Sequence, residues 1–182
     1  MANAIEVLAY IKKSFPTSGR MRRQKILYYA QAWHLAWQGA PLFEEDIEAW
    51  EMEPVVPTAW RADKEWNADL VAEHTGGLTT VQSQIVDAVW AFYGESDGTA
   101  LSARTHKEDP WVRHSEDVNS FLRGNDIIPK EEMRSYYSVK SLSDFSTPQK
   151  PALQAQGVSD DELFEALEQE LPRWGRNTPT AC

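Results

Sequence analysis

The chain has 182 residues, and 18 Lys and Arg against 28 Asp and Glu give it a formal net charge of −10. This balance disfavours nucleic-acid binding, which depends on neutralising phosphates with basic side chains, and it suits a basic protein partner. The one cysteine, Cys182, excludes a disulfide framework and a cysteine-based zinc site, while the lack of a membrane-length apolar run or a signal peptide predicts a cytoplasmic protein.

The first two predicted helices are the clearest. Apolar residues at helical spacing predict a helix from Ala4 to Phe15, ended by Pro16. A second helix is predicted over 21–38, with Gly39 just after its last turn. Its stretch KILYYAQAWHLAW is apolar on more than one face, which is typical of a central helix, so we expect most of its aromatic surface to lie in the core.

The segment near residues 46–56 reads differently. Apolar and polar residues alternate from Ile47 to Met52, which predicts a short β-hairpin or extended segment, and Pro54 and Pro57 predict a rigid turn after it. Another helix follows Thr58. The predicted fold class is therefore mainly α: a compact helical domain with this one short β element.

Further helices follow in the second half of the chain. A capping box of Thr79 and Gln82 predicts the start of a helix that ends at Gly94, and a short helix is expected over 98–106. A polar stretch should come next, then a helix with Pro129 as its first residue. We assign residues 1–142 to the helical domain and 143–182 to a linker and tail, in which one short helix begins near Ser159.

A catalytic arrangement is not visible in the sequence. The four histidines do not fall at metal-ligand spacing, and neither a GxSxG motif nor a phosphate-binding loop is present. A site built on His106 and His114 with the carboxylates between them is the one enzymatic alternative; hydrogen bonding of His106 near a helix end is the structural one. We therefore expect a protein that is not an enzyme, with no cofactor and no metal.

Three segments resemble one known family. RQKILYYAQAWHLAWQGAPLFEEDIEAWEMEPVVP, LSARTHKEDPWV and IIPKEEMRSYY are similar, in this order, to the signatures of the Panacea antitoxin domain, also called SocA-like or GepA-like. The resemblance spans about residues 4–142. The motif residues, to which we assign a structural role, are Tyr28, Tyr29, Trp33, His34, Pro54, Val55, Thr105, His106, Pro110 and Trp111. The family usually has Gly where this chain has Glu53, so a positive φ there would strain the turn.

The resemblance implies a helical, non-enzymatic antitoxin. Such domains occur in bacteria and phages beside diverse small toxins and neutralise them by direct protein binding. In one branch of the family, the protein is instead a proteolysis adaptor that delivers a toxin to an ATP-dependent protease. A cognate protein toxin is thus the expected partner and the protease an alternative one, with no membrane and no nucleic acid.

Two surfaces are candidates for partner binding. The first is an acidic patch around an aromatic residue of the predicted hairpin, and the second is the apolar edge of the C-terminal helix, outside the resemblance. The alternatives are that Trp50 lies in the core and that the C-terminal helix folds back onto the domain. The candidate residues are Glu44, Glu45, Asp46, Glu48, Trp50, Leu163, Phe164 and Leu167.

Overall fold

The computed structural model describes residues 2–65, 73–74, 76–115, 126–144 and 146–152. The chain divides into two units, Met1–Pro151 and Ala152–Cys182, and the helices and strands with defined bounds belong to the first. The predicted C-terminal helix, with Leu163, Phe164 and Leu167, lies outside the described residues.

The described part is mainly α, as the sequence predicts. Seven helices and one two-stranded antiparallel hairpin have defined bounds: α1 Ala4–Ser14, α2 Arg20–Gln38, β1 Glu48–Ala49, β2 Pro54–Val55, α3 Pro57–Glu65, α5 Thr80–Tyr93, α6 Gly98–Thr105, α7 Asp109–Ser115 and α8 Lys130–Ser143. None of the described helices is long and apolar enough to cross a bilayer.

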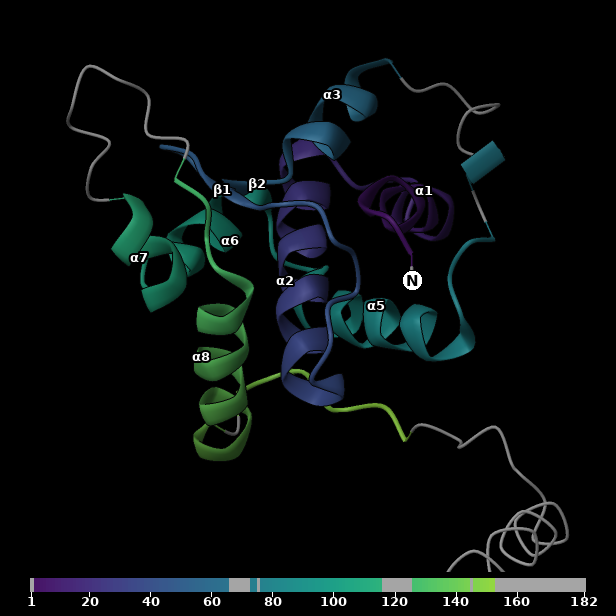
Figure 1. Ribbon diagram of the computed structural model, residues 1–182. Helices are drawn as coiled ribbons and strands as arrows, with labels where there is room; N and C mark the ends of the chain where they lie inside the picture. Colours follow the sequence, from purple (N-terminus) through teal and green to yellow (C-terminus); the bar gives the residue numbers. More distant parts are fainter. Residues whose placement is uncertain (1, 66–72, 75, 116–125, 145, 153–182) are drawn as a thin grey trace, which may run out of the picture. The chain divides into compact units, whose positions relative to one another are not determined.

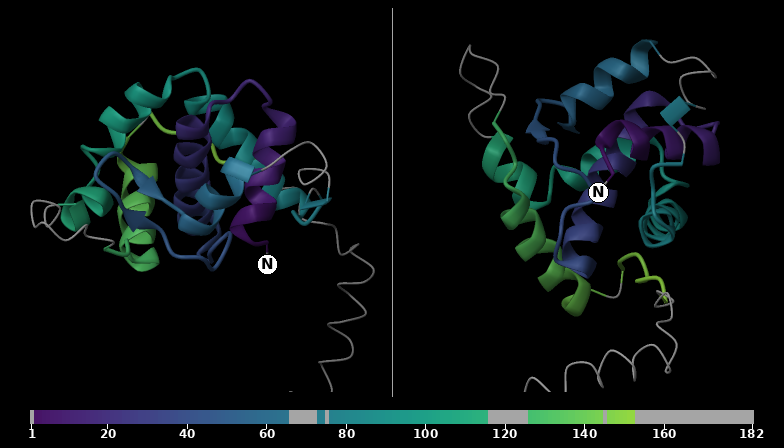
Figure 2. Two further views of the ribbon diagram at one scale, coloured as in Figure 1. Left: turned by 90° about the horizontal axis from the view of Figure 1, so that it is seen from above. Right: turned by 45° about the vertical axis from the view of Figure 1, so that its right-hand side comes forward.

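Helix α2 lies at the centre of this unit. It contacts α1, α3, α5, α6, α8 and β2, and Figures 1 and 2 show these elements arranged around it. Every residue from Gln24 to Leu35 is buried. Its aromatic rings pack against neighbouring helices: Tyr29 stacks on Tyr93 of α5 at 4.0 Å, and Trp33 meets Tyr137 of α8 edge-on at 5.2 Å. The aromatic surface of this helix is therefore core.

The ends of the helices follow local rules. Gly39 has φ 72° and ends α2 in the left-handed conformation, with its N–H donating to the Leu35 carbonyl. The capping box of Thr79 and Gln82 begins α5 as predicted. Two expectations are wrong. Residues 109–115 form α7 where a polar connection is expected from the sequence, because proline is compatible with the first turn of a helix, and Pro129 is the N-cap of α8 rather than its first residue.

The hairpin has the predicted alternation from Ile47 to Trp50, whereas Glu51 and Met52, in the turn, are both exposed. Ile47 and Ala49 are buried, whereas Glu48 and Trp50 are partly exposed. The turn is closed by two hydrogen bonds between the backbones of Trp50 and Glu53. No non-glycine residue in the described part has a positive φ, so Glu53, at the position where the family that the chain resembles usually has Gly, is without backbone strain.

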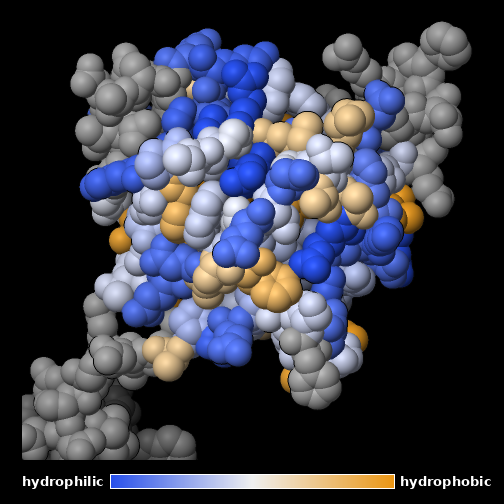
Figure 3. Space-filling view, turned by 180° about the vertical axis from the view of Figure 1, so that it is seen from behind, coloured by the Kyte–Doolittle hydropathy of each residue, from blue (hydrophilic) through white to orange (hydrophobic). Residues whose placement is uncertain are grey.

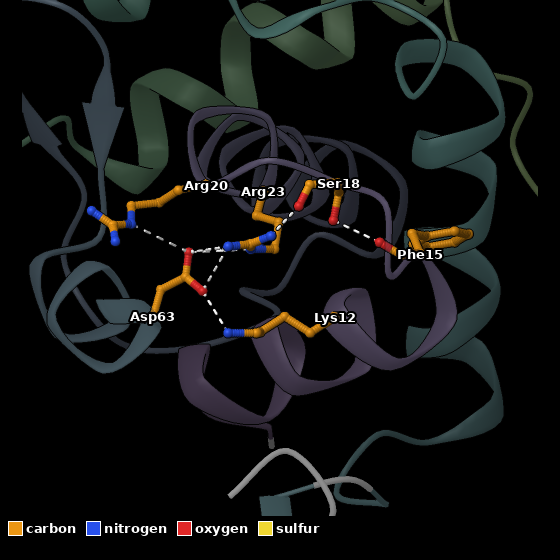
Figure 4. Close-up of polar contacts among 6 residues, drawn as sticks. All are labelled: Lys12, Phe15, Ser18, Arg20, Arg23 and Asp63. Atoms are coloured by element: carbon orange, nitrogen blue, oxygen red, sulfur yellow. Dashed lines mark hydrogen bonds and ion pairs between the residues drawn. The ribbon is translucent and has the colours of Figure 1, made fainter. Parts of the chain in front are cut away.

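Helix α3 is attached through one buried carboxylate. Asp63, with its side chain fully buried, accepts hydrogen bonds from Lys12 of α1 at 2.8 Å and from Arg23 of α2 at 3.0 Å (Figure 4). Arg20 lies 4.0 Å away, and Arg23 also donates to the Ser18 carbonyl. One acidic side chain thus joins three helices.

The surface seen from behind is mostly hydrophilic (Figure 3). Hydrophobic side chains gather there only in small, separate patches, which is ordinary for a protein surface. Among the described residues, this face does not offer one broad apolar area for a partner.

We predict that Asp63→Asn lowers the free energy of unfolding by about 3 kcal/mol, because it leaves clustered cations without their buried counter-charge. Urea unfolding measures this. The matched control is Asp46→Asn, whose exposed carboxylate lies 3.6 Å from Lys130 and should cost less than about 1 kcal/mol. Equal effects of the two substitutions would contradict the role given to Asp63.

Candidate functional site

A lysine of the first family motif is buried beneath the hairpin. The side chain of Lys25 has no exposed surface; its Nζ donates to Thr105 Oγ1 at 3.1 Å and lies 3.8 Å from Glu53 Oε2. Burial lowers the pKa of Lys25 to about 8, although Glu53 and Glu108 act in the opposite direction. Burial likewise raises the pKa of Glu53, against the effect of Lys25. This contact joins α2, the hairpin and α6.

Glu108, between α6 and α7, is the main acceptor of the interior. One of its oxygens accepts hydrogen bonds from Tyr29 at 3.1 Å and Tyr137 at 2.8 Å, and the other binds Lys140 Nζ at 2.6 Å. Glu108 itself is 2% exposed. The second family motif is thereby bound to α2 and to α8, which carries the third.

The tyrosines around Glu108 stay protonated. Burial raises the pKa of Tyr28, Tyr29 and Tyr137 well above 10, and the carboxylate of Glu108 adds to the rise in each case. Their hydroxyls can therefore act as hydrogen-bond donors at neutral pH. Two of them donate to the carboxylate, and the hydroxyls of Tyr28 and Tyr137 lie 3.3 Å apart.

Helices α6 and α7 hold the hairpin by its backbone carbonyls. Ser102 Oγ and His106 Nε2 donate to the Met52 carbonyl at 2.7 and 3.2 Å. Trp111 Nε1 donates to the Trp50 carbonyl at 3.2 Å, and its ring stacks on His106 at 3.9 Å. The second motif thus provides side chains that fix the turn of the first.

The residues of the enzymatic alternative do not converge. His106 stacks on Trp111 and binds the hairpin, whereas His114 lies 3.2 Å from Glu132 of α8. Glu108 is occupied by three donors. Among the described residues, no group of three His, Cys, Asp or Glu side chains is placed to hold a metal ion.

The other motif residues lie inside the fold. His34 is 6% exposed, and its Nδ1 donates to the Ala40 carbonyl at 2.8 Å; burial lowers its pKa, although this hydrogen bond raises it. Tyr28, Tyr29, Trp33 and Thr105 are fully buried, and Pro54, Val55 and Pro110 are also buried. Each of these side chains therefore contributes to packing.

The acidic side chains of the hairpin region have different environments. Glu45 accepts a hydrogen bond from the Ala4 amide, Asp46 lies 3.6 Å from Lys130, and Glu48 accepts one from Trp50 Nε1 at 2.8 Å. Glu44 is exposed, and its carbonyl accepts from Lys130. Trp50 is partly exposed and meets Trp60 edge-on at 5.3 Å. The residues lie close together in the chain, but three of the four acids also bind parts of this protein.

An open groove of about 720 Å³ lies between α7 and α8. Pro110, Tyr136 and Val139 are its apolar lining. A smaller hollow of about 300 Å³ beside α6 shares Tyr136 and Lys140 with it and includes Glu108 in its lining. The buried network therefore reaches the surface at this smaller hollow, and Lys140 also lines the groove.

Sequence reasoning missed the polar centre of this arrangement. Lys25 and Tyr137 fall within the motif segments without standing out as site residues, and Glu108 enters only as one of the carboxylates between His106 and His114. The available signal was weak: Lys25 lies at the start of the apolar run, directly after Arg23 and Gln24, and a lysine that is buried there must find a partner. The pairing of Glu108 with Lys140, 32 positions apart, has no local signal.

We predict that the contribution of Lys25 to the free energy of unfolding increases with pH. Between pH 8 and its ordinary pKa of 10.5, the unfolded chain binds the Lys25 proton more tightly than the folded protein does, so raising the pH favours folding. From about pH 7.5 to 9.5, the free energy of unfolding should rise by about 1–2 kcal/mol relative to Lys25→Met. Denaturant unfolding at each pH measures this.

The control is Lys13→Met, at an exposed position of α1, which should follow the wild-type pH dependence. A Lys25→Met curve parallel to the wild type over this range would contradict the assignment. The raised pKa values of the buried tyrosines act in the opposite direction only above about pH 10.

Comparison with known protein families finds a match over part of the chain. The family model described as "Antitoxin SocA-like, Panacea domain" matches residues 24–112. No curated protein and no solved structure matches the chain. The matched segment contains most of α2, the hairpin and α6, and it includes the buried Lys25 and Glu108. Residues 24–112 are therefore similar to the SocA-like Panacea antitoxin domain family.

Proposed function

We propose that this protein is an antitoxin that neutralises a cognate protein toxin by binding it directly, and that it is not an enzyme. The observation that carries the proposal is the match of residues 24–112 to the SocA-like Panacea antitoxin domain. An antitoxin of this kind needs a stable, specific surface rather than a reactive group.

The environment of the ionisable side chains supports this proposal. Lys25, Glu108 and His106, the groups that chemistry could have used, bind other parts of the fold. Their positions stabilise the hairpin and the helices around it. The outer surfaces of these elements are then the parts available to a partner.

The net charge supports a basic partner. A protein of charge −10 attracts a positively charged toxin over distances of about the Debye length and so accelerates their association. This attraction weakens in high salt. Affinity itself requires an apolar contact area in addition.

The test is co-expression of the tagged protein with the product of the gene adjacent to its own, with growth and complex formation measured together. We expect restored growth and a stoichiometric complex that survives purification. Growth restored without a complex, with the neighbouring protein degraded, would instead assign the chain to proteolytic delivery. Repeating the assay in a host without the ATP-dependent protease separates these outcomes, because direct binding does not need the protease.

A further inference from the structure

We propose that the groove between α7 and α8 is the toxin-binding surface and that it takes a basic, amphipathic segment of the toxin. This inference rests on the proposed function and specifies its surface. The walls of the groove are α7 and α8, which lie side by side and are joined by His114 and Glu132 at 3.2 Å (Figure 1).

Helix α8 exposes apolar side chains beside the groove. Leu142 is 89% exposed and Val139 is 65% exposed, the two highest values among the large hydrophobic residues described. Val139 lines the groove, together with Tyr136 one turn earlier. A helix that exposes such side chains beside a groove is a typical docking site for an apolar helix face.

The charge of the groove lining also supports this site. Four carboxylates line the groove, from Asp109, Glu131, Glu132 and Asp144, against two cations, Arg113 and Lys140, so the lining has two more negative charges than positive ones. Lys140 binds buried Glu108 at 2.6 Å, and Arg113 lies 3.3 Å from Asp109. Glu131 and Glu132 are also paired, with Arg134 at 2.8 Å and His114 at 3.2 Å, but these are surface pairs that a partner's cation can exchange at small cost. A bound segment with Lys or Arg beside its apolar face would complement this lining.

Charge also argues against the other occupants. A second copy of this chain has a net charge of −10 and would bring like charge to an acidic groove. The chain's own residues 159–171 contain six acidic residues and no Lys or Arg. A basic protein segment is the occupant that complements the groove.

Acidic side chains in the hairpin region and in the groove both bind other parts of the protein. Ala4, Lys130 and Trp50 hold three acids of the hairpin region, and Arg113, Arg134 and His114 hold three acids of the groove. The groove is favoured because it is hollowed and because Val139, which lines it, is 65% exposed.

The test compares Val139→Asp in the groove with Met52→Asp on the hairpin, each in the full-length protein. Met52 is the matched control because it is also apolar and 59% exposed. The probe is the product of the adjacent gene, titrated against each purified variant. We expect Val139→Asp to weaken binding at least tenfold and to lose growth rescue, whereas Met52→Asp should change binding less than threefold. Thermal unfolding should show both variants folded.

A second variant tests the charge. Asp144→Lys should slow association several-fold, and the difference from wild type should shrink in high salt. If the wild-type protein forms the complex and both groove variants bind as tightly as it does, the assignment of the groove is overturned while the antitoxin function stands. No complex with the wild-type protein would overturn both. Conversion of a dimer of the free chain into a monomer by Val139→Asp would assign the groove to a second copy and would also overturn the inference.

Discussion

The carboxylate of Glu108 is the interaction on which the arrangement depends. A carboxylate that is 2% exposed must be hydrogen-bonded, because an unpaired buried charge costs several kcal/mol. Its donors come from α2 and α8, and Glu108 itself follows α6. The elements that carry these groups must therefore keep the relative position in which all three donors reach the Glu108 carboxylate.

The same requirement explains why the three motif segments meet in the interior. The first motif provides Lys25 and Tyr29, the second provides Thr105 and Glu108, and α8 provides Tyr137. Their polar atoms meet inside the protein, where each would be costly without the others. Lys140 belongs both to this network and to the lining of the α7–α8 groove, so the network also positions one side chain of the groove.

Much of the fold could be predicted from the sequence, because its signals are local. The apolar periodicity of α2, the capping box at Thr79 and the alternation near Ile47 each depend on neighbouring residues. Helix α7 is not predicted from the sequence because Pro110 follows the short helix over 98–106 and is therefore interpreted as a helix end, whereas it lies in the first turn of the next helix. The polar network and the groove depend on residues such as Glu108 and Lys140, which become neighbours only in the folded protein. Those features could not be derived from spacing.

The central claim is that buried Glu108 holds α8 on the core. The most direct test is hydrogen exchange of the α8 amides in Glu108→Gln, with the free energy of unfolding measured on the same sample. The substituted amide side chain would keep the shape but not the charge, so we expect a loss of about 3 kcal/mol and faster exchange in α8 than in α1. Unchanged stability, with α8 protected as in the wild type, would contradict this account.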